Sequence, residues 1–142
     1  MSVRVLGVNR SRPSAREHDH LRTSLLVRGR LAAALRSGNE PGVNSALSTA
    51  SRVIGAHVCH LGTADASFAS PREVYRFCLL VNARSVIAAH DHPSGNLEPS
   101  SADVQVTRQI KAAGEGAGVT LPDSVVCGYD GRYTSLAERG LM

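Results

Sequence analysis

The sequence lacks the features that would place the chain in or across a membrane. It contains no apolar run of about 18 residues, the shortest stretch expected of a membrane-spanning helix. Residues 1–8 do not form the long apolar segment of a secretory signal peptide. We therefore expect a cytoplasmic protein with no membrane partner.

Cysteine is also scarce, and its three positions, Cys59, Cys78 and Cys127, lie far apart. An odd number of dispersed cysteines suits a reducing compartment, and it argues against a disulfide scaffold. The same spacing excludes a cysteine-rich zinc site. We interpret the three residues as small apolar side chains of the core.

Acidic residues are few at the start of the chain. Residues 1–38 carry eight arginines and two acidic residues, a net charge of +6, whereas the whole chain has a net charge of +4. Such an arm could contact DNA or another polyanion. It has no aromatic residue for base stacking, so base-specific recognition is not indicated. A solvated, partly disordered arm explains the same composition.

The length of 142 residues allows one domain with a hydrophobic core. We divide the chain into a basic, partly disordered arm (residues 1–38) and a folded domain (residues 39–142). Apolar residues at roughly helical spacing predict a short helix over residues 16–36 of the arm. No internal repeat is evident.

The folded domain mixes strand and helix patterns, which predicts an α/β (α+β) fold. Residues 40–47 form a poor strand, because Pro41 and Gly42 suit an edge strand or a loop. Such an edge would invite pairing between copies, but the oligomeric state stays open. Clearer strands are expected at residues 52–60, 85–90 and 123–128, with a hairpin turn at residues 130–131.

Three helices are expected in this domain, at residues 70–81, 101–113 and 135–140. Ser70 followed by Pro71 is a typical helix start, and Glu73 would close a capping box with Ser70. In the second helix, Val106, Ile110 and Ala113 should point inward.

The candidate functional residues follow the strand at residues 85–90. His90 and His92 are alternate residues of an extended chain, so they can point at one spot. Ser100 begins the next helix, and Asp103 lies in its first turn, where the helix dipole favours its anionic form. Two imidazoles and one carboxylate can bind zinc and leave a fourth position for water, as catalytic zinc sites do.

Other zinc-enzyme patterns are absent, both His-Glu-x-x-His and the deaminase signature. The spacing His-x-His, seven residues, Ser, two residues, Asp instead resembles the JAMM (MPN-plus) metalloproteases. The sequence from His90 to Asp103 closely resembles that of the RadC branch of the superfamily, whose members have long been labelled DNA-repair proteins. The resemblance implies a JAMM/MPN-like mixed β-sheet flanked by helices in residues 39–142, and a zinc hydrolase (Zn²⁺ cofactor) acting on a peptide or protein.

The resemblance also implies roles for individual residues. The motif serine, Ser100, would assist the oxyanion or orient the attacking water, and it can cap the helix as well. The family's general base is a glutamate on an upstream strand. In RadC relatives this glutamate lies about 22 residues before a Gly-Thr pair, which Gly62-Thr63 matches here. The resemblance therefore implies Glu40 as the base; a surface-loop glutamate is the alternative. Asp123 and Ser124 stand where relatives usually carry Asp-His.

Two functions therefore stay open. The first is a zinc-dependent, RadC-like hydrolase of the JAMM metallopeptidase type that uses a metal-activated water. The second is a catalytically weak or inactive RadC-like scaffold associated with DNA or protein partners. A degenerate copy from a mobile element is a third interpretation. The intact set of metal ligands argues that any sequence decay did not reach the metal site.

Overall fold

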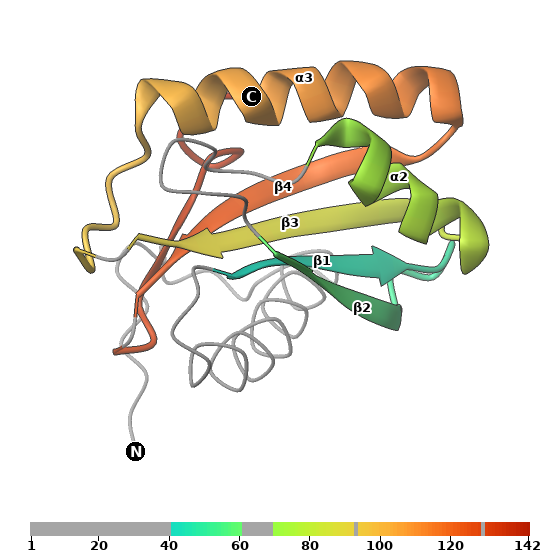
Figure 1. The fold of residues 1–142 in the computed structure, drawn as a ribbon, viewed down its shortest axis with the longest axis horizontal. Helices are drawn as coiled ribbons and strands as arrows, with labels where there is room; N and C mark the ends of the chain where they lie inside the picture. The colour runs from blue at the N-terminus through green and yellow to red at the C-terminus, as the bar shows by residue number, and fades with distance from the viewer. Residues whose placement is uncertain (1–40, 61–69, 93, 129) are drawn as a thin grey trace, which may run out of the picture.

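The structure, a computed structural model, describes residues 41–60, 70–92, 94–128 and 130–142 (Figure 1). The expected helix at residues 16–36 and Glu40 lie outside these ranges. The described elements are β1 (Pro41–Leu47), β2 (Val53–His60), α2 (Pro71–Leu80), β3 (Ser85–Asp91), α3 (Ser101–Ala117), β4 (Thr120–Cys127) and β5 (Tyr133–Ser135).

The five strands form one mixed sheet in the order β2-β1-β3-β4-β5. β1 is antiparallel to both β2 and β3, whereas β3 and β4 run parallel, joined through α3. β5 returns antiparallel to β4, as the hairpin signal at residues 130–131 predicts. The mixed strand directions and the flanking helices confirm the expected α+β fold.

Strand β3 lies at the centre of the sheet, and all seven of its residues are buried. Helices α2 and α3 cover one face (Figure 1), where the larger core cluster includes Val86 and Ala88 of β3. Ala89 belongs to a second cluster on the opposite face, with Val43 and Val125. Because side chains alternate along a strand, His90 faces the helix side and Asp91 the other side.

Strand β1 is an interior strand, so the expectation of an edge strand or a loop at residues 40–47 is wrong. Pro41 is the first residue of the strand, a position that tolerates the missing amide hydrogen. Tertiary packing overrides the low strand propensity of the residues that follow, since all of residues 42–47 are buried. The expected reason for pairing between copies through this strand is therefore removed, because β2 and β5 are the edges of the sheet that the described residues form.

The helices differ from expectation at their ends. Ser70 is the N-cap of α2, but its side chain makes no capping hydrogen bond, so the expected capping box with Glu73 does not form. Helix α3 continues to Ala117 and ends at Gly118, whose φ of 69° is the left-handed conformation that glycine adopts readily. Ala113, expected to point inward, is exposed. The buried side of α3 instead consists of Asp103, Thr107, Ile110 and Gly114.

The expected helix at residues 135–140 is a series of turns. Asp123 holds this segment against the sheet, because its carboxylate accepts hydrogen bonds from the Ser135 hydroxyl (2.7 Å) and from the Ala137 amide (3.1 Å). Within the described residues, no helix combines the length and the apolar character required to cross a bilayer.

The two helices are joined by a buried hydrogen bond in which Tyr75 Oη donates to the Ile110 carbonyl oxygen at 2.7 Å. Burial, together with the nearby Cys78 thiol, raises the pKa of Tyr75 from 10.0 to about 12. The folded chain therefore holds this proton at a pH where the unfolded chain has released it.

We expect the contribution of Tyr75 to stability to be fully present below pH 10.0 and to be lost as the pH rises to about 12. Urea unfolding across this range measures the effect. The Tyr75→Phe variant, which cannot ionise at this position, should lose less stability over the same range than the parent chain. Equal slopes for the two proteins would contradict the assignment.

Candidate metal centre

The residues of the His-x-His motif lie where β3 ends and the chain leaves the sheet. His90 is the next-to-last residue of β3, and His92 follows the strand directly. Asp103 comes from the first turn of α3, which approaches the same end of the sheet (Figure 1). A strand and a helix separated by a loop thus bring the three side chains together, as their spacing predicts.

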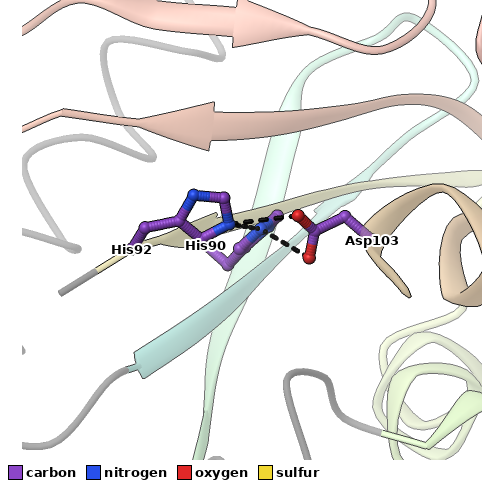
Figure 2. A group of neighbouring side chains, drawn as sticks. All are labelled: His90, His92 and Asp103. Atoms are coloured by element: carbon purple, nitrogen blue, oxygen red, sulfur yellow. Dashed lines mark hydrogen bonds and ion pairs between the residues drawn. The ribbon is translucent and has the colours of Figure 1, made fainter. Parts of the chain in front are cut away.

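The three side chains form one compact cluster, and their potential ligand atoms all lie within 4.8 Å of one another. His90 Nε2 is 3.2 Å from His92 Nε2 and 3.2 Å from Asp103 Oδ1, while His92 Nε2 is 3.1 Å from Asp103 Oδ2. Figure 2 shows the two rings and the carboxylate facing one another. The cluster is closed on the inside, since the His90 and Asp103 side chains are 2% and 1% exposed, and it opens at His92, which is 19% exposed.

A backbone carbonyl fixes the orientation of the His92 ring. His92 Nδ1 lies 2.8 Å from the carbonyl oxygen of Asn96. Because a carbonyl oxygen can only accept, Nδ1 carries a hydrogen, and Nε2 is the ring nitrogen that faces His90 and the carboxylate. This orientation makes Nε2 the atom of His92 that would bind a metal ion.

The capping box of α3 anchors the carboxylate. The Ser100 amide donates to Asp103 Oδ2 at 2.7 Å, and Ser100 Oγ accepts from the Asp103 amide at 3.1 Å. Burial alone would raise the pKa of Asp103, but hydrogen bonds from His90 and Ser100 outweigh it and hold the pKa well below its usual value. Asp103 is therefore a carboxylate near neutral pH, the form that binds metal ions.

The loop between His92 and Ser100 is held in shape by its own side chains. Ser94 Oγ accepts from the Asn96 amide, and Asn96 Oδ1 accepts from the Glu98 amide. Glu98 also forms a bidentate ion pair with Arg139, with both oxygens 2.7 Å from Nη1. The two hydrogen bonds within the loop keep the Asn96 carbonyl in place for the His92 ring.

The donor set fits a divalent metal ion with nitrogen and oxygen ligands. Neighbouring ligands around a tetrahedral zinc ion, with bonds of about 2.0–2.1 Å, lie about 3.3 Å apart. The two imidazole nitrogens are 3.2 Å apart, and each lies 3.1–3.2 Å from a different oxygen of Asp103, so all three separations are close to this spacing. Three protein ligands leave a coordination position on the open side, at His92, for water or substrate. The hydrogen bond on His92 Nδ1 is of the kind that orients metal-binding histidines.

The other predicted site residues stand as follows. Ser100 lies beside the cluster and is exposed; its oxygen accepts the capping hydrogen bond, which leaves its hydrogen available to donate. Glu40 lies outside the described residues. The orientation of His92 by Asn96 was not predictable from residue types, because the contact is made by a backbone carbonyl, which every residue has.

Comparisons with known proteins agree with this geometry. A family profile described as "RadC-like JAB domain" matches residues 24–141. A UPF0758 protein of Thermosynechococcus vestitus is 45% identical over 87 residues, 61% of this chain and 34% of the relative. A UPF0758 protein of Marinomonas sp. is 48% identical over 96 residues, and one of Moorella thermoacetica is 41% identical over 96 residues; each match spans 68% of this chain and 42% of the relative.

The chain thus spans 34–42% of the length of these curated relatives. Their printed names give a family number and state no activity. The match therefore assigns a domain to this chain, and it does not assign the substrates or partners of the longer proteins.

Proposed function

The chain belongs to the family of RadC-like JAB domains, and from that premise we propose that it is a zinc-dependent hydrolase of the JAMM metallopeptidase type that acts on peptide or protein substrates. The observation that carries the proposal is the His90, His92 and Asp103 cluster, whose ligand atoms lie within 4.8 Å of one another. Imidazole nitrogen and carboxylate oxygen, without cysteine, suit zinc in a catalytic site.

A bound zinc ion would supply Lewis-acid polarisation of a substrate carbonyl and would lower the pKa of a water molecule toward neutrality. The protein's own residues hold the ligand geometry and keep bulk solvent away from the inner side, since His90 and Asp103 are buried. Substrate would enter on the side of His92. Ser100, exposed beside Asp103, would donate its hydroxyl hydrogen to the developing oxyanion or to the attacking water.

We retain Glu40 as the proposed general base. Val43 of β1 pairs with Ala89 of β3, so the first residues of β1 lie beside the end of β3 that carries His90. Glu40 directly precedes Pro41 in the sequence. This proximity along the chain supports a role in moving the proton of the attacking water.

The proposal is tested with the zinc-loaded chain and a mixture of unstructured peptides, with release of new amino groups as the readout. We expect Glu40→Gln to lower kcat by about 10²–10⁴-fold, the usual contribution of a general base, and to leave zinc affinity unchanged. Glu73→Gln is the matched control, because Glu73 is an exposed glutamate in the first turn of α2. Full activity in Glu40→Gln would remove Glu40 as the base.

A RadC-like scaffold that binds DNA is the second proposal, and the net charge of +6 on residues 1–38 favours it. Binding through these arginines should weaken steeply as salt rises. A zinc-loaded chain that cleaves no peptide but binds duplex DNA in this salt-dependent way would favour the scaffold over the hydrolase. If DNA binding were absent or did not depend on salt, the proposal of a DNA-binding scaffold would be wrong.

A further inference from the structure

Two buried hydroxyl oxygens on the helix side of the sheet, Thr107 Oγ1 and Ser124 Oγ, have no hydrogen-bond partner among the described residues, and Asp103 Oδ1 has only its ion-pair contact with His90 Nε2 at 3.2 Å. Thr107 and Ser124 are 0% exposed, and Asp103 is 1% exposed. A buried hydroxyl without a partner costs free energy and is uncommon in folded proteins. If the two hydroxyls face the same region as the Asp103 carboxylate, they indicate a polar ligand that all three groups can share.

Thr107 lies one helical turn after Asp103 on the buried side of α3. Residues four apart on a helix are neighbours, and side chains lean toward the N-terminus of their helix. The Thr107 side chain therefore leans toward the turn that carries Asp103.

Ser124 approaches the same place from the sheet. It pairs with Ala88 of β3, and Ala88 belongs to the core cluster on the helix side, so Ser124 also faces the helices. Helix α3 and strand β4 run in opposite directions from the turn at Gly118, where a Cβ on Gly114 would meet the Val119 carbonyl oxygen at 2.3 Å.

Equal distances along the two elements locate Ser124 relative to the helix. Five strand residues, from Val119 to Ser124, span about 16 Å, which equals about 11 helical residues. Counting back from Gly114, this places Ser124 level with the first turns of α3, where Asp103 and Thr107 lie.

We propose that Thr107 and Ser124 hold one buried water molecule that donates a hydrogen bond to Asp103 Oδ1. A water molecule needs two to four polar partners, and these three atoms supply donors and acceptors in that number. The two hydroxyls carry no charge, which suits a neutral ligand, and their complete burial excludes substrate from this position.

The water would make Thr107 and Ser124 positioning residues for the metal-binding carboxylate. The Ser100 amide already holds Asp103 Oδ2, and the water would hold Oδ1. A carboxylate fixed at both oxygens cannot rotate away from the two imidazoles, and such outer hydrogen bonds raise metal affinity. This inference rests on the metal site of the proposed function but not on hydrolysis.

The test compares zinc dissociation constants, measured by competition with a chromogenic chelator, in Thr107→Val, Thr107→Ser and Ser124→Ala. We expect Thr107→Val, which keeps the shape of the side chain, to weaken zinc binding by about tenfold, and Ser124→Ala to do the same. Thr107→Ser retains the hydroxyl and should bind zinc within about twofold of the parent. The visible spectrum of the cobalt-loaded chain should change in the first and third variants only.

A purely structural role would lower the melting temperature of the metal-free Thr107→Val variant and leave its zinc affinity unchanged; that result overturns the positioning role.

A high-resolution crystal structure of the parent chain provides an independent check, whether or not any variant folds. Density for a water between the two hydroxyls supports the proposal, and an empty space there overturns it. A parent chain that binds no zinc would overturn both the positioning role and the proposed function. Zinc binding without peptide cleavage would count against the hydrolase alone.

Discussion

We expect the Asp103→Asn variant to remain folded and to bind zinc more than about 100-fold less tightly than the parent chain, because loss of a direct ligand should exceed the cost of losing an outer partner. Asparagine has nearly the same shape, and its carbonyl oxygen can still accept the hydrogen bond from the Ser100 amide that completes the capping box. What it removes is the negative charge between two imidazole nitrogens, 3.1 and 3.2 Å away.

Glu98→Gln is the matched control for this variant. It removes the same charge, five residues earlier, from an exposed carboxylate that pairs with Arg139. An exposed ion pair contributes at most about 1 kcal/mol, so this variant should keep both stability and zinc affinity close to those of the parent. Isothermal titration calorimetry with zinc measures the two variants side by side. If both variants lost affinity equally, general electrostatic attraction rather than coordination by Asp103 would explain the binding.

Gly114→Ala should destabilise the chain by about 3 kcal/mol, the upper part of the usual range for overpacking a core. A Cβ at this position would lie 2.3 Å from Tyr75 Oη and 2.3 Å from the Val119 carbonyl oxygen. The carbonyl belongs to the backbone just before β4 and cannot move aside as a flexible side chain can. Relief of the contact would displace α3 from α2 and break the Tyr75 hydrogen bond to Ile110.

Gly116→Ala, two residues later in the same helix, provides the comparison. A Cβ there meets nothing within 4 Å, so the alanine should stabilise the helix by up to about 1 kcal/mol. Chemical denaturation of the two variants and the parent gives both values. Equal stabilities of the two variants would show that close packing at Gly114 does not constrain the helix.

The motif at the metal centre could be predicted from the sequence because it combines two local periodicities. Alternate residues of a strand bring His90 and His92 to one side, and the first turn of a helix presents Asp103. Such local rules need no knowledge of the remaining chain. The strands at residues 52–60, 85–90 and 123–128 were predictable for the same reason.

Features that depend on distant contacts were not predictable. Residues 41–47 carry weak strand signals, yet they form an interior strand because β2 and β3 flank them on both sides. Residues 135–140 resemble a helix, yet Asp123, twelve residues before Ser135, holds them as turns. The proposed proximity of Thr107 and Ser124 to Asp103 was not predictable either, because it depends on how α3 packs on the sheet that contains Ser124.

The central claim is that His90, His92 and Asp103 together bind one divalent metal ion. Anomalous diffraction at the zinc edge, from crystals of the full chain grown with zinc, tests it most directly. We predict one strong anomalous peak per chain, within about 2.0–2.2 Å of two imidazole nitrogens and one carboxylate oxygen of these residues. Zinc located elsewhere on the chain, with no peak between these three side chains, would contradict the claim.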